Sequence, residues 1–311
     1  MTAAVQSGAR TRRRAVGAWA TIGLFMLPAL SLYVLFVLLP IAQAVRFSFF
    51  KWNGLAPLTE FVGLANYERA LADPVFIGAV SHNVLIVVLS LALQIPFALG
   101  LALMLNRRFR GRAALRLVFF APYVIAEVIT GVVWSLLLQP GGLAEGALEA
   151  FGLGSLYHPW LADPSTVMLA LFVIISWKYF GFHMILLLAG LQGIPRELDE
   201  AAAMDGASRR QAIRYVTLPL LGPTLRVSVF LSIIGALQLF DLVWVTTGGG
   251  PVNASNTMAT YMFDWGFRRF QLGYGSAVAV ILFILALVVA LAYQRFVMRR
   301  DIEGAVTIYG G

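Results

Sequence analysis

Six long apolar stretches restrict this chain of 311 residues to very few folds. A helix needs roughly 20 apolar residues to cross the hydrocarbon core of a bilayer. The chain is 60% hydrophobic and only 12% charged, whereas about a quarter of the residues in a soluble domain are charged. We therefore predict an all-α membrane protein with six transmembrane helices, near residues 18–42, 78–105, 114–139, 166–190, 221–245 and 273–297. Pro122 lies inside the third stretch, where neighbouring groups can satisfy the carbonyl that a proline frees, so we expect one span there.

Positive residues are distributed unevenly between the loops, and this indicates the orientation in the membrane. Five of the 23 Lys and Arg residues lie on the expected outer side, and Lys178 lies within a span. The other 17 lie on the expected cytoplasmic side: Arg10, Arg12, Arg13, Arg14, Arg107, Arg108, Arg110, Arg112, Arg116, Arg196, Arg209, Arg210, Arg214, Arg226, Arg295, Arg299 and Arg300. We expect both termini in the cytoplasm, with residues 1–17 as an N-terminal segment, 18–297 as the membrane domain and 298–311 as a tail.

The charged start of the chain could also belong to a cleaved secretory signal. The apolar run after Arg14 is longer than the core of such a signal, and it has no clear small-residue cleavage site. We therefore expect a retained first helix.

A polar loop at residues 194–219 separates two of the apolar stretches and predicts two short helices joined at a corner. Pro195 suits a first helical position, because no amide hydrogen is needed there. The alanines that follow have high helix propensity, and Gly206 supplies a stop. Ser208 and Gln211 have the spacing of a capping box, which predicts the start of a second helix. The physics alone leaves a docking role open beside an ordinary Ala-rich helix ended by glycine.

The same loop resembles the EAA loop of the membrane subunits of binding-protein-dependent ABC importers. The matching positions are Glu200, Ala201, Ala202, Gly206, Leu218 and Pro219. Val216 replaces the usual isoleucine, a difference of one methylene. The resemblance implies a type I ABC importer permease fold with cytoplasmic EAA coupling helices.

In this family the EAA loop is held by the ATP-binding subunits. The resemblance implies that Glu200 contacts a basic residue in the ATPase cleft, while Ala201, Ala202 and Ala203 keep that face small. Asp205 and Gly206 lie at the corner, where Gly206 sets the angle between the helices. A Gly206→Ala substitution is therefore expected to disturb coupling.

The expected outer loops carry a second resemblance, to carbohydrate-importer permeases. Residues 61–67 with 71–74 are similar to the segment after the first span in that subfamily. Residues 248–251, 259–261 and 273–277 are similar to its last outer loop and the start of its sixth span. Each match alone is weak, but they occur in the expected order and at matching distances.

Several other functions lack the residues that they need. A phosphate-binding loop requires Gly-Lys followed by Ser or Thr, but the only lysines, Lys51 and Lys178, follow Phe and Trp. We therefore expect no cofactor on this chain, with ATP and Mg held by partner subunits. The chain has no cysteine, its three histidines show no paired metal spacing, and no metal site is expected. The net charge of +8 is explained by topology, not by nucleic-acid binding.

Two charges near the middle of expected spans, Glu127 and Lys178, are costly in a membrane, at roughly 2.5 to 3.5 kcal/mol each. They should face a cavity or each other, and an ion pair between them is one of the possibilities. Ile175, Lys178, Tyr179 and Phe182 recur at helical spacing on one face. This pattern is compatible with a surface that stacks on a sugar ring, and also with ordinary helix packing.

The resemblance to maltose-type permeases implies a mid-membrane sugar site on the spans before and after the EAA loop. The matching positions are Lys178, Tyr179, Phe182, Ser232, Gly235 and Ala236. Lys178 and Ala236 are not the residue types of those permeases, which argues against assuming maltose. Gln238 and Asp241, toward the outer end of the fifth stretch, complete the predicted pathway.

The sequence thus predicts a non-enzymatic permease subunit of a bacterial inner membrane importer for sugars. The expected partners are membrane lipid, a second homologous permease, two ATP-binding subunits and a solute-binding protein that docks around residues 50–75, 140–165 and 246–272. An ABC permease for another solute such as glycerol 3-phosphate, a secondary transporter and a membrane enzyme are the alternatives. A secondary transporter would show inverted repeats or ion-coupling acids.

Overall fold

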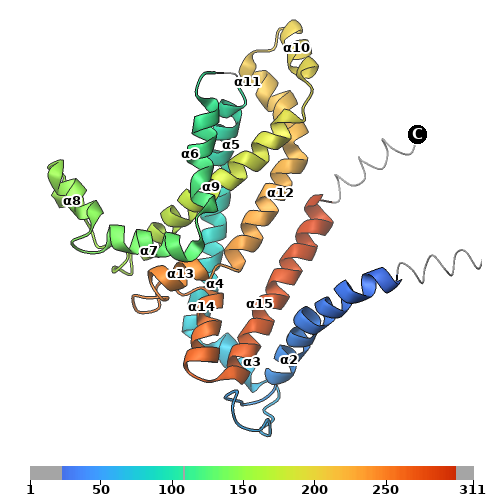
Figure 1. The fold of residues 1–311 in the computed structure, drawn as a ribbon, viewed down its shortest axis with the longest axis vertical. Helices are drawn as coiled ribbons and strands as arrows, with labels where there is room; N and C mark the ends of the chain where they lie inside the picture. The colour runs from blue at the N-terminus through green and yellow to red at the C-terminus, as the bar shows by residue number, and fades with distance from the viewer. Residues whose placement is uncertain (1–22, 108, 299–311) are drawn as a thin grey trace, which may run out of the picture.

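The computed structural model describes residues 23–107 and 109–298, and this part of the chain is built from helices (Figure 1). Its only β pairing is an isolated antiparallel bridge between Phe50 and Phe61. The all-α prediction is confirmed. The segment 1–17 and residues 299–311 of the expected tail lie outside the described residues.

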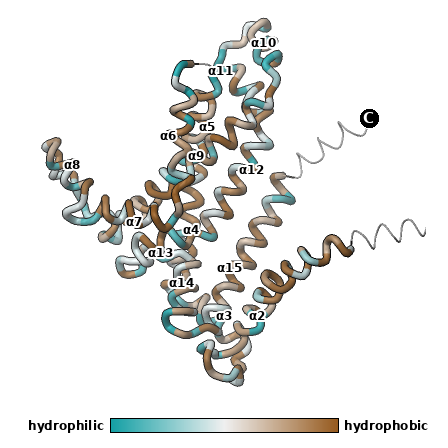
Figure 2. The backbone as a smooth tube through the Cα atoms, in the orientation of Figure 1, coloured by the Kyte–Doolittle hydropathy of each residue, from teal (hydrophilic) through white to brown (hydrophobic). Residues whose placement is uncertain are grey.

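Five continuous helices are long and apolar enough to cross a membrane. The first, Gly23–Phe47, contains η1 (Val34–Leu38) and α2 (Leu39–Phe47), and the second, Pro74–Leu105, contains α4 (Pro74–Leu89), η2 (Ser90–Gln94) and α5 (Ile95–Leu105). The third is α9 (Val167–Gln192), and the fourth, Arg209–Leu237, contains α11 (Arg209–Ala212), η4 (Ile213–Thr217) and α12 (Leu218–Leu237). The fifth, Leu272–Met298, contains α15 (Leu272–Tyr293) and η6 (Gln294–Met298). Hydrophobic residues run along these helices, while α10 (Arg196–Met204) at one end mixes hydrophilic and apolar residues (Figure 2).

The third apolar stretch is not one straight span. It forms α6 (Arg112–Val124) and α7 (Glu127–Leu138), which meet at 97°. Pro122 has no amide hydrogen for the preceding turn, and Ile125 and Ala126 leave the helical region with ψ of 136° and 144°. The expectation of an unbroken helix over 114–139 is therefore wrong, and six spans are reached only if this bent pair counts as one.

The fifth stretch is shifted from its expected position at 221–245. Its helix starts at Arg209 and ends at Leu237, and α13 (Asp241–Thr246) follows as a separate short helix. Free carbonyls at a helix end need partners, and here buried side chains supply them. Asn83 Nδ2 donates to the carbonyl of Ala236 at 2.6 Å, and Thr257 Oγ1 donates to that of Leu239 at 2.7 Å.

Short helices complete the two ends of the molecule. At the end away from α10 lie α3 (Ala65–Ala72), α14 (Met258–Phe263) and η5 (Asp264–Arg268), whereas α8 (Leu143–Ala150) and η3 (Gly154–Leu156) follow α7 to one side (Figure 1). Three buried apolar clusters follow one another along the bundle. The first surrounds Tyr261 and Tyr274, the second Leu171 and Leu242, and the third Leu187 and Leu221 near the base of α10.

The contact between α6 and α9 depends on Gly181. A methyl group there would lie 2.0 Å from the carbonyl oxygen of Phe119, which is backbone and cannot turn aside. We expect Gly181→Ala to lower the free energy of unfolding by about 1–3 kcal/mol, the usual cost of overpacking. Thermal unfolding in detergent measures the effect. Gly100→Ala on α5 is the control, since no atom lies within 4 Å of its added methyl; equal stability of the two variants would contradict the close packing.

Candidate functional site

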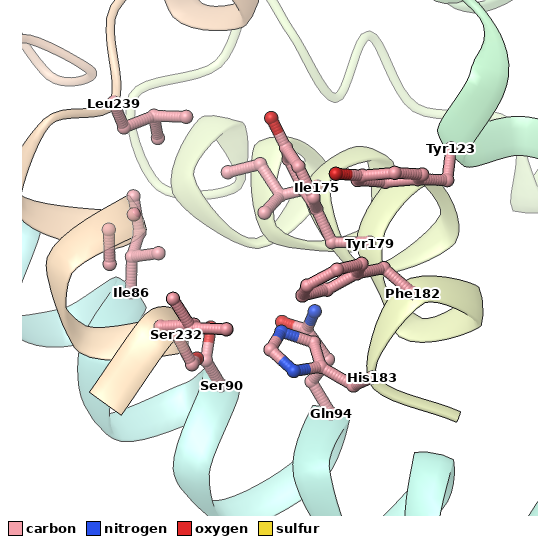
Figure 3. A pocket seen from close by; sticks show the side chains of 13 residues that line it. Ile86, Ser90, Gln94, Tyr123, Ile175, Tyr179, Phe182, His183, Ser232 and Leu239 are labelled. Carbon is pink, nitrogen blue, oxygen red and sulfur yellow. The ribbon is translucent and has the colours of Figure 1, made fainter. Parts of the chain in front are cut away.

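A cavity of about 260 Å³ lies within the bundle, between the second span, α6, α9 and α12 (Figure 3). Its lining residues are Ile86, Ser90, Gln94, Tyr123, Ile175, Tyr179, Phe182, His183, Leu231, Ser232, Gly235, Ala236 and Leu239. Ile86, Ile175, Ala236 and Leu239 also belong to one buried apolar cluster, so the cavity is continuous with the core.

Aromatic rings form one wall of this cavity. Tyr123, at the end of α6, stacks on Phe182 of α9, with ring centroids 4.9 Å apart and planes at 23°. Tyr179 meets Tyr123 edge-on at 6.1 Å, and His183 meets Phe182 edge-on at 5.2 Å. Tyr123 is the residue before the last of α6. The wall can therefore offer a flat apolar face next to phenol hydroxyls.

Polar groups from the second span form another part of the lining. Ser90 and Gln94 are the first and last residues of η2, a π-helical turn inside an otherwise α-helical span. Such turns are rare and occur frequently at functional sites. Ser232 of α12 adds a hydroxyl, and His183 Nδ1 lies 2.8 Å from Ser228 Oγ just outside the lining.

The predicted pathway residues divide into two groups in the structure. Tyr179, Phe182, Ser232 and Gly235 line the cavity. Lys178, Gln238 and Asp241 do not belong to its lining. Gln238 follows the last residue of α12, and Asp241 begins α13, so the two do not share a helix as the sequence suggested. The role of all seven residues in transport remains a prediction.

Sequence reasoning missed Ser90, Gln94, Tyr123 and His183 as lining residues. The signal for Ser90 and Gln94 was two hydrogen-bonding side chains, four residues apart, in an otherwise apolar stretch. Tyr123 could not be placed without the break after α6.

Glu127 and Lys178 find partners at the α6–α7 break. The Lys178 ammonium donates to the carbonyl oxygens of Ile125 and Tyr123, and the Tyr179 hydroxyl donates to Glu127 Oε1. Among the described residues, no ion pair joins Glu127 to Lys178 within 4.0 Å. The two charged side chains thus find their hydrogen-bond partners near the α6–α7 break, and neither belongs to the cavity lining.

The EAA-like loop forms a helical corner at one end of the bundle (Figure 1). α10 ends at Met204, and Gly206 adopts a left-handed conformation with φ of +81°. Ser208 and Gln211 form the expected capping box, at 3.4 Å and 2.7 Å. Glu200, Ala201, Ala203, Asp205 and Pro219 are exposed, whereas Ala202 and Leu218 are half-buried.

The second helix of this corner differs from the expectation of a short separate helix. α11 continues without a break through η4 and α12 to Leu237. Pro219 lies at the second residue of α12 and does not interrupt the helix, because a π-helical turn precedes it. One continuous helix therefore joins the loop to the cavity wall at Ser232 and Gly235.

The left-handed conformation at Gly206 gives a testable expectation. An alanine there meets no atom within 4 Å, so the only cost is backbone strain, about 1–2 kcal/mol. We expect Gly206→Ala to lower the melting temperature slightly and to weaken ATPase coupling. Gly193→Ala is the matched control, because Gly193 follows the last residue of α9 with φ of −79°, a conformation that tolerates a side chain. If Gly206→Ala and Gly193→Ala give the same coupling between ATPase activity and transport, the angle at Gly206 has no special role.

The expected docking loops at 50–75 and 246–272 meet at the opposite end of the bundle. Arg69 lies over the rings of Trp265 and Tyr274, at 4.5 and 4.1 Å, and donates to Gln271 at 2.8 Å. Tyr261 donates to Asp73, and burial together with that bond raises the pKa of Tyr261. The loop at 140–165 contains α8 and η3, which extend to one side of the bundle (Figure 1).

The chain is similar to membrane subunits of ABC transporters. A family model described as binding-protein-dependent transport system inner membrane component matches residues 94–301. A probable ABC transporter permease of Pyrococcus horikoshii is 35% identical, over 87% of this chain and 93% of its own length. The trehalose/maltose transport system permease protein MalF of Thermococcus litoralis is 34% identical, over 88% and 92%.

A solved structure shares the fold. It is a chain of a bacterial ABC transporter involved in the import of the acidic polysaccharide alginate, with a TM-score of 0.81. The two are 24% identical, and the match covers 93% of this chain and 99% of the other.

Proposed function

Because the chain belongs to the family of binding-protein-dependent transport system inner membrane components, we propose that its cavity is one half of a sugar pathway through the bacterial inner membrane. The chain is a multi-pass permease subunit of an ABC importer. The sugar specificity is supported by relatives whose names specify trehalose/maltose, sulfoquinovosyl glycerol and diacetylchitobiose.

The observation that carries the proposal is the lining of the cavity. An aromatic wall, in which Tyr123 stacks on Phe182, lies beside hydroxyl and amide groups inside a membrane bundle. Sugars present apolar ring faces and hydroxyl edges, so aromatic stacking beside hydrogen-bonding groups is the chemistry that matches them. The residues proposed to contact the sugar are Tyr123, Tyr179, Phe182 and Ser232.

The proposed mechanism is alternating access driven by partner subunits. Two ATP-binding subunits, which hold the ATP and Mg, grip α10 of this chain and of a second, homologous permease. The continuous helix Arg209–Leu237 then transmits movement of the loop to the cavity wall. This chain contributes binding and movement and carries no chemical step of its own.

The orientation follows from the same proposal. The α10 end faces the cytoplasm, where ATP is available, and both termini lie on that side. A solute-binding protein delivers the sugar at the opposite end, formed by residues 50–75 and 246–272 together with the loop at 140–165. A related structure holds an alginate ABC transporter in complex with a periplasmic protein bound to an alginate pentasaccharide, which supports such a partner.

Purification of the assembled complex tests the proposal. We expect tagged permease to copurify with an ATP-binding subunit, and a sugar loaded on the binding protein to stimulate its ATPase activity. The panel contains maltose, trehalose, diacetylchitobiose, glycerol 3-phosphate and an alginate oligosaccharide. A permease that transports without any ATPase subunit would instead be a secondary transporter. If glycerol 3-phosphate alone stimulates the ATPase activity, the transported solute is a phosphate ester and not a sugar.

A further inference from the structure

We infer that Ser90 and Gln94 bind hydroxyl groups of the transported solute, and that the cavity selects an uncharged sugar unit. The inference rests on the proposed function and deepens it. It concerns the second span, whereas the resemblance to maltose-type permeases implied a sugar site on the spans that flank the EAA-like loop.

Ser90 and Gln94 are polar side chains without protein partners in a buried position. Their residues are 2% and 4% exposed. Within residues 23–107 and 109–298, neither side chain makes a hydrogen bond to protein. Nearby Asn83 differs, since it donates to Ala236 at 2.6 Å and accepts from the amide of Met258 at 2.9 Å. Buried polar groups are costly when unpaired, so the cavity contents are the natural partners of Ser90 and Gln94.

Helical spacing places both side chains on one face of the second span. They occupy the two ends of η2, four residues apart, and both line the cavity. Figure 3 shows them rising from one helix, on the side of the cavity away from Tyr123 and Tyr179. A sugar ring that stacks on the aromatic wall would thus direct hydroxyl groups toward Ser90 and Gln94.

The lining, which is drawn from the described residues, contains no Asp, Glu, Lys or Arg. Lys178 is next to Tyr179 in sequence, but its ammonium donates hydrogen bonds to the carbonyls of Tyr123 and Ile125. Glu127 likewise accepts a hydrogen bond from the Tyr179 hydroxyl. The one histidine of the lining, His183, is engaged through Nδ1 with Ser228. A carboxylate or sulfonate in the cavity would find no Lys or Arg among the lining side chains, and an uncompensated charge in an apolar interior is strongly disfavoured. We therefore assign a neutral solute to this half of the pathway.

The size of the cavity fits a small unit. Its volume is about 260 Å³, below the range of about 300–1,000 Å³ of sites for drug-sized ligands. It suits one sugar ring at a time, with any further rings extending along the pathway.

The absence of cysteine from the chain permits a direct labelling test. Ser90→Cys and Gln94→Cys are introduced singly into the whole complex, whose partner subunits are also made cysteine-free. Small methanethiosulfonates that are neutral, cationic or anionic serve as probes. Val88→Cys is the control, because Val88 lies on the same span, is 54% exposed and does not line the cavity.

We expect the neutral reagent to modify both cavity cysteines at least tenfold faster than either charged reagent. We also expect a neutral sugar from the panel, loaded on the binding protein, to slow the modification, and Val88→Cys to be insensitive to sugar. Equal rates for anionic and neutral reagents at both positions would overturn the assignment of a neutral solute.

Uptake kinetics test the residues separately from the proposed function. Ser90→Ala and Gln94→Leu should each raise the apparent KM for the neutral sugar about fivefold, the effect of one lost hydrogen bond. An unchanged KM in both variants, together with no protection by sugar, would overturn the role of Ser90 and Gln94 while leaving sugar import intact. If the unsubstituted complex imports no sugar of the panel, the proposed function fails, and the selectivity of labelling still reports on cavity charge.

Discussion

The Glu200→Arg substitution is expected to lower ATP-driven uptake at least a hundredfold. Glu200 is exposed on α10 and makes no ion pair with other described residues. Its proposed partner is a basic residue in the ATPase cleft, so an arginine would place like charges together in an interface, which costs several kcal/mol. ATPase activity of the complex, uptake into vesicles and copurification of the ATPase subunit together measure the loss.

Two further measurements separate docking from folding. Glu200→Gln keeps the shape of the side chain and removes only the attraction, so its defect should be smaller than that of Glu200→Arg. The melting temperature of the isolated permease should be the same for both variants, because an exposed, unpaired side chain contributes little to stability. Normal assembly and transport by Glu200→Arg would show that α10 does not dock through this residue.

The second large effect is expected at Lys178. Lys178 is only 2% exposed, and its ammonium donates to two carbonyl oxygens at the break between α6 and α7. Lys178→Met leaves these carbonyls without a donor and leaves Glu127 without a nearby positive charge. Removing one partner from a buried charged network typically costs about 3–5 kcal/mol. We expect a loss of this size in the free energy of unfolding, measured by denaturation in detergent.

The chain contains a matched control, its only other lysine. Lys51 is paired with Glu60 at 3.1 Å, but 74% of its side chain is exposed. Exposed ion pairs contribute about 0–1 kcal/mol, so Lys51→Met should be nearly neutral. The double variant Glu127→Gln/Lys178→Met should recover part of the loss, because it also removes the negative charge that Lys178→Met leaves without a nearby positive charge. Equal stability of Lys178→Met and Lys51→Met would contradict the role assigned to the break.

The sequence was sufficient for the features that depend on local patterns. Apolar length located the first, second, fourth and sixth spans to within a few residues. The corner around Gly206 followed from propensity, a capping box and a glycine stop. These signals act over a few residues and do not depend on the rest of the fold.

The breaks in the helices could not be predicted in the same way. A proline such as Pro122 bends a membrane helix or is accommodated, depending on what its neighbours offer. Here Lys178 of α9 supplies a donor to the carbonyls at the break. At the end of α12, Asn83 and Thr257 supply donors to the carbonyls of Ala236 and Leu239. Lys178 is 53 and 55 residues from the two carbonyls that it contacts, Asn83 is 153 residues from Ala236, and Thr257 is 18 residues from Leu239.

The same limit applied to the candidate site. Tyr179 and Phe182 were found from helical spacing on one span, but Lys178 on that span points to the break. Ser90 and Gln94 enter through a π-helical turn, whose position no residue pattern in the sequence announced. A cavity lined by four elements needs their relative placement, which periodicity within one helix does not contain.

Uptake by reconstituted vesicles tests the central claim most directly. The complex of this chain with its second permease and ATP-binding subunits is placed in proteoliposomes, with binding protein and radiolabelled neutral sugar outside and ATP enclosed. We predict accumulation of sugar that requires both enclosed ATP and the binding protein, and that is lost in the Glu200→Arg complex. Uptake that continues without ATP, or that follows an imposed ion gradient instead, would contradict the account.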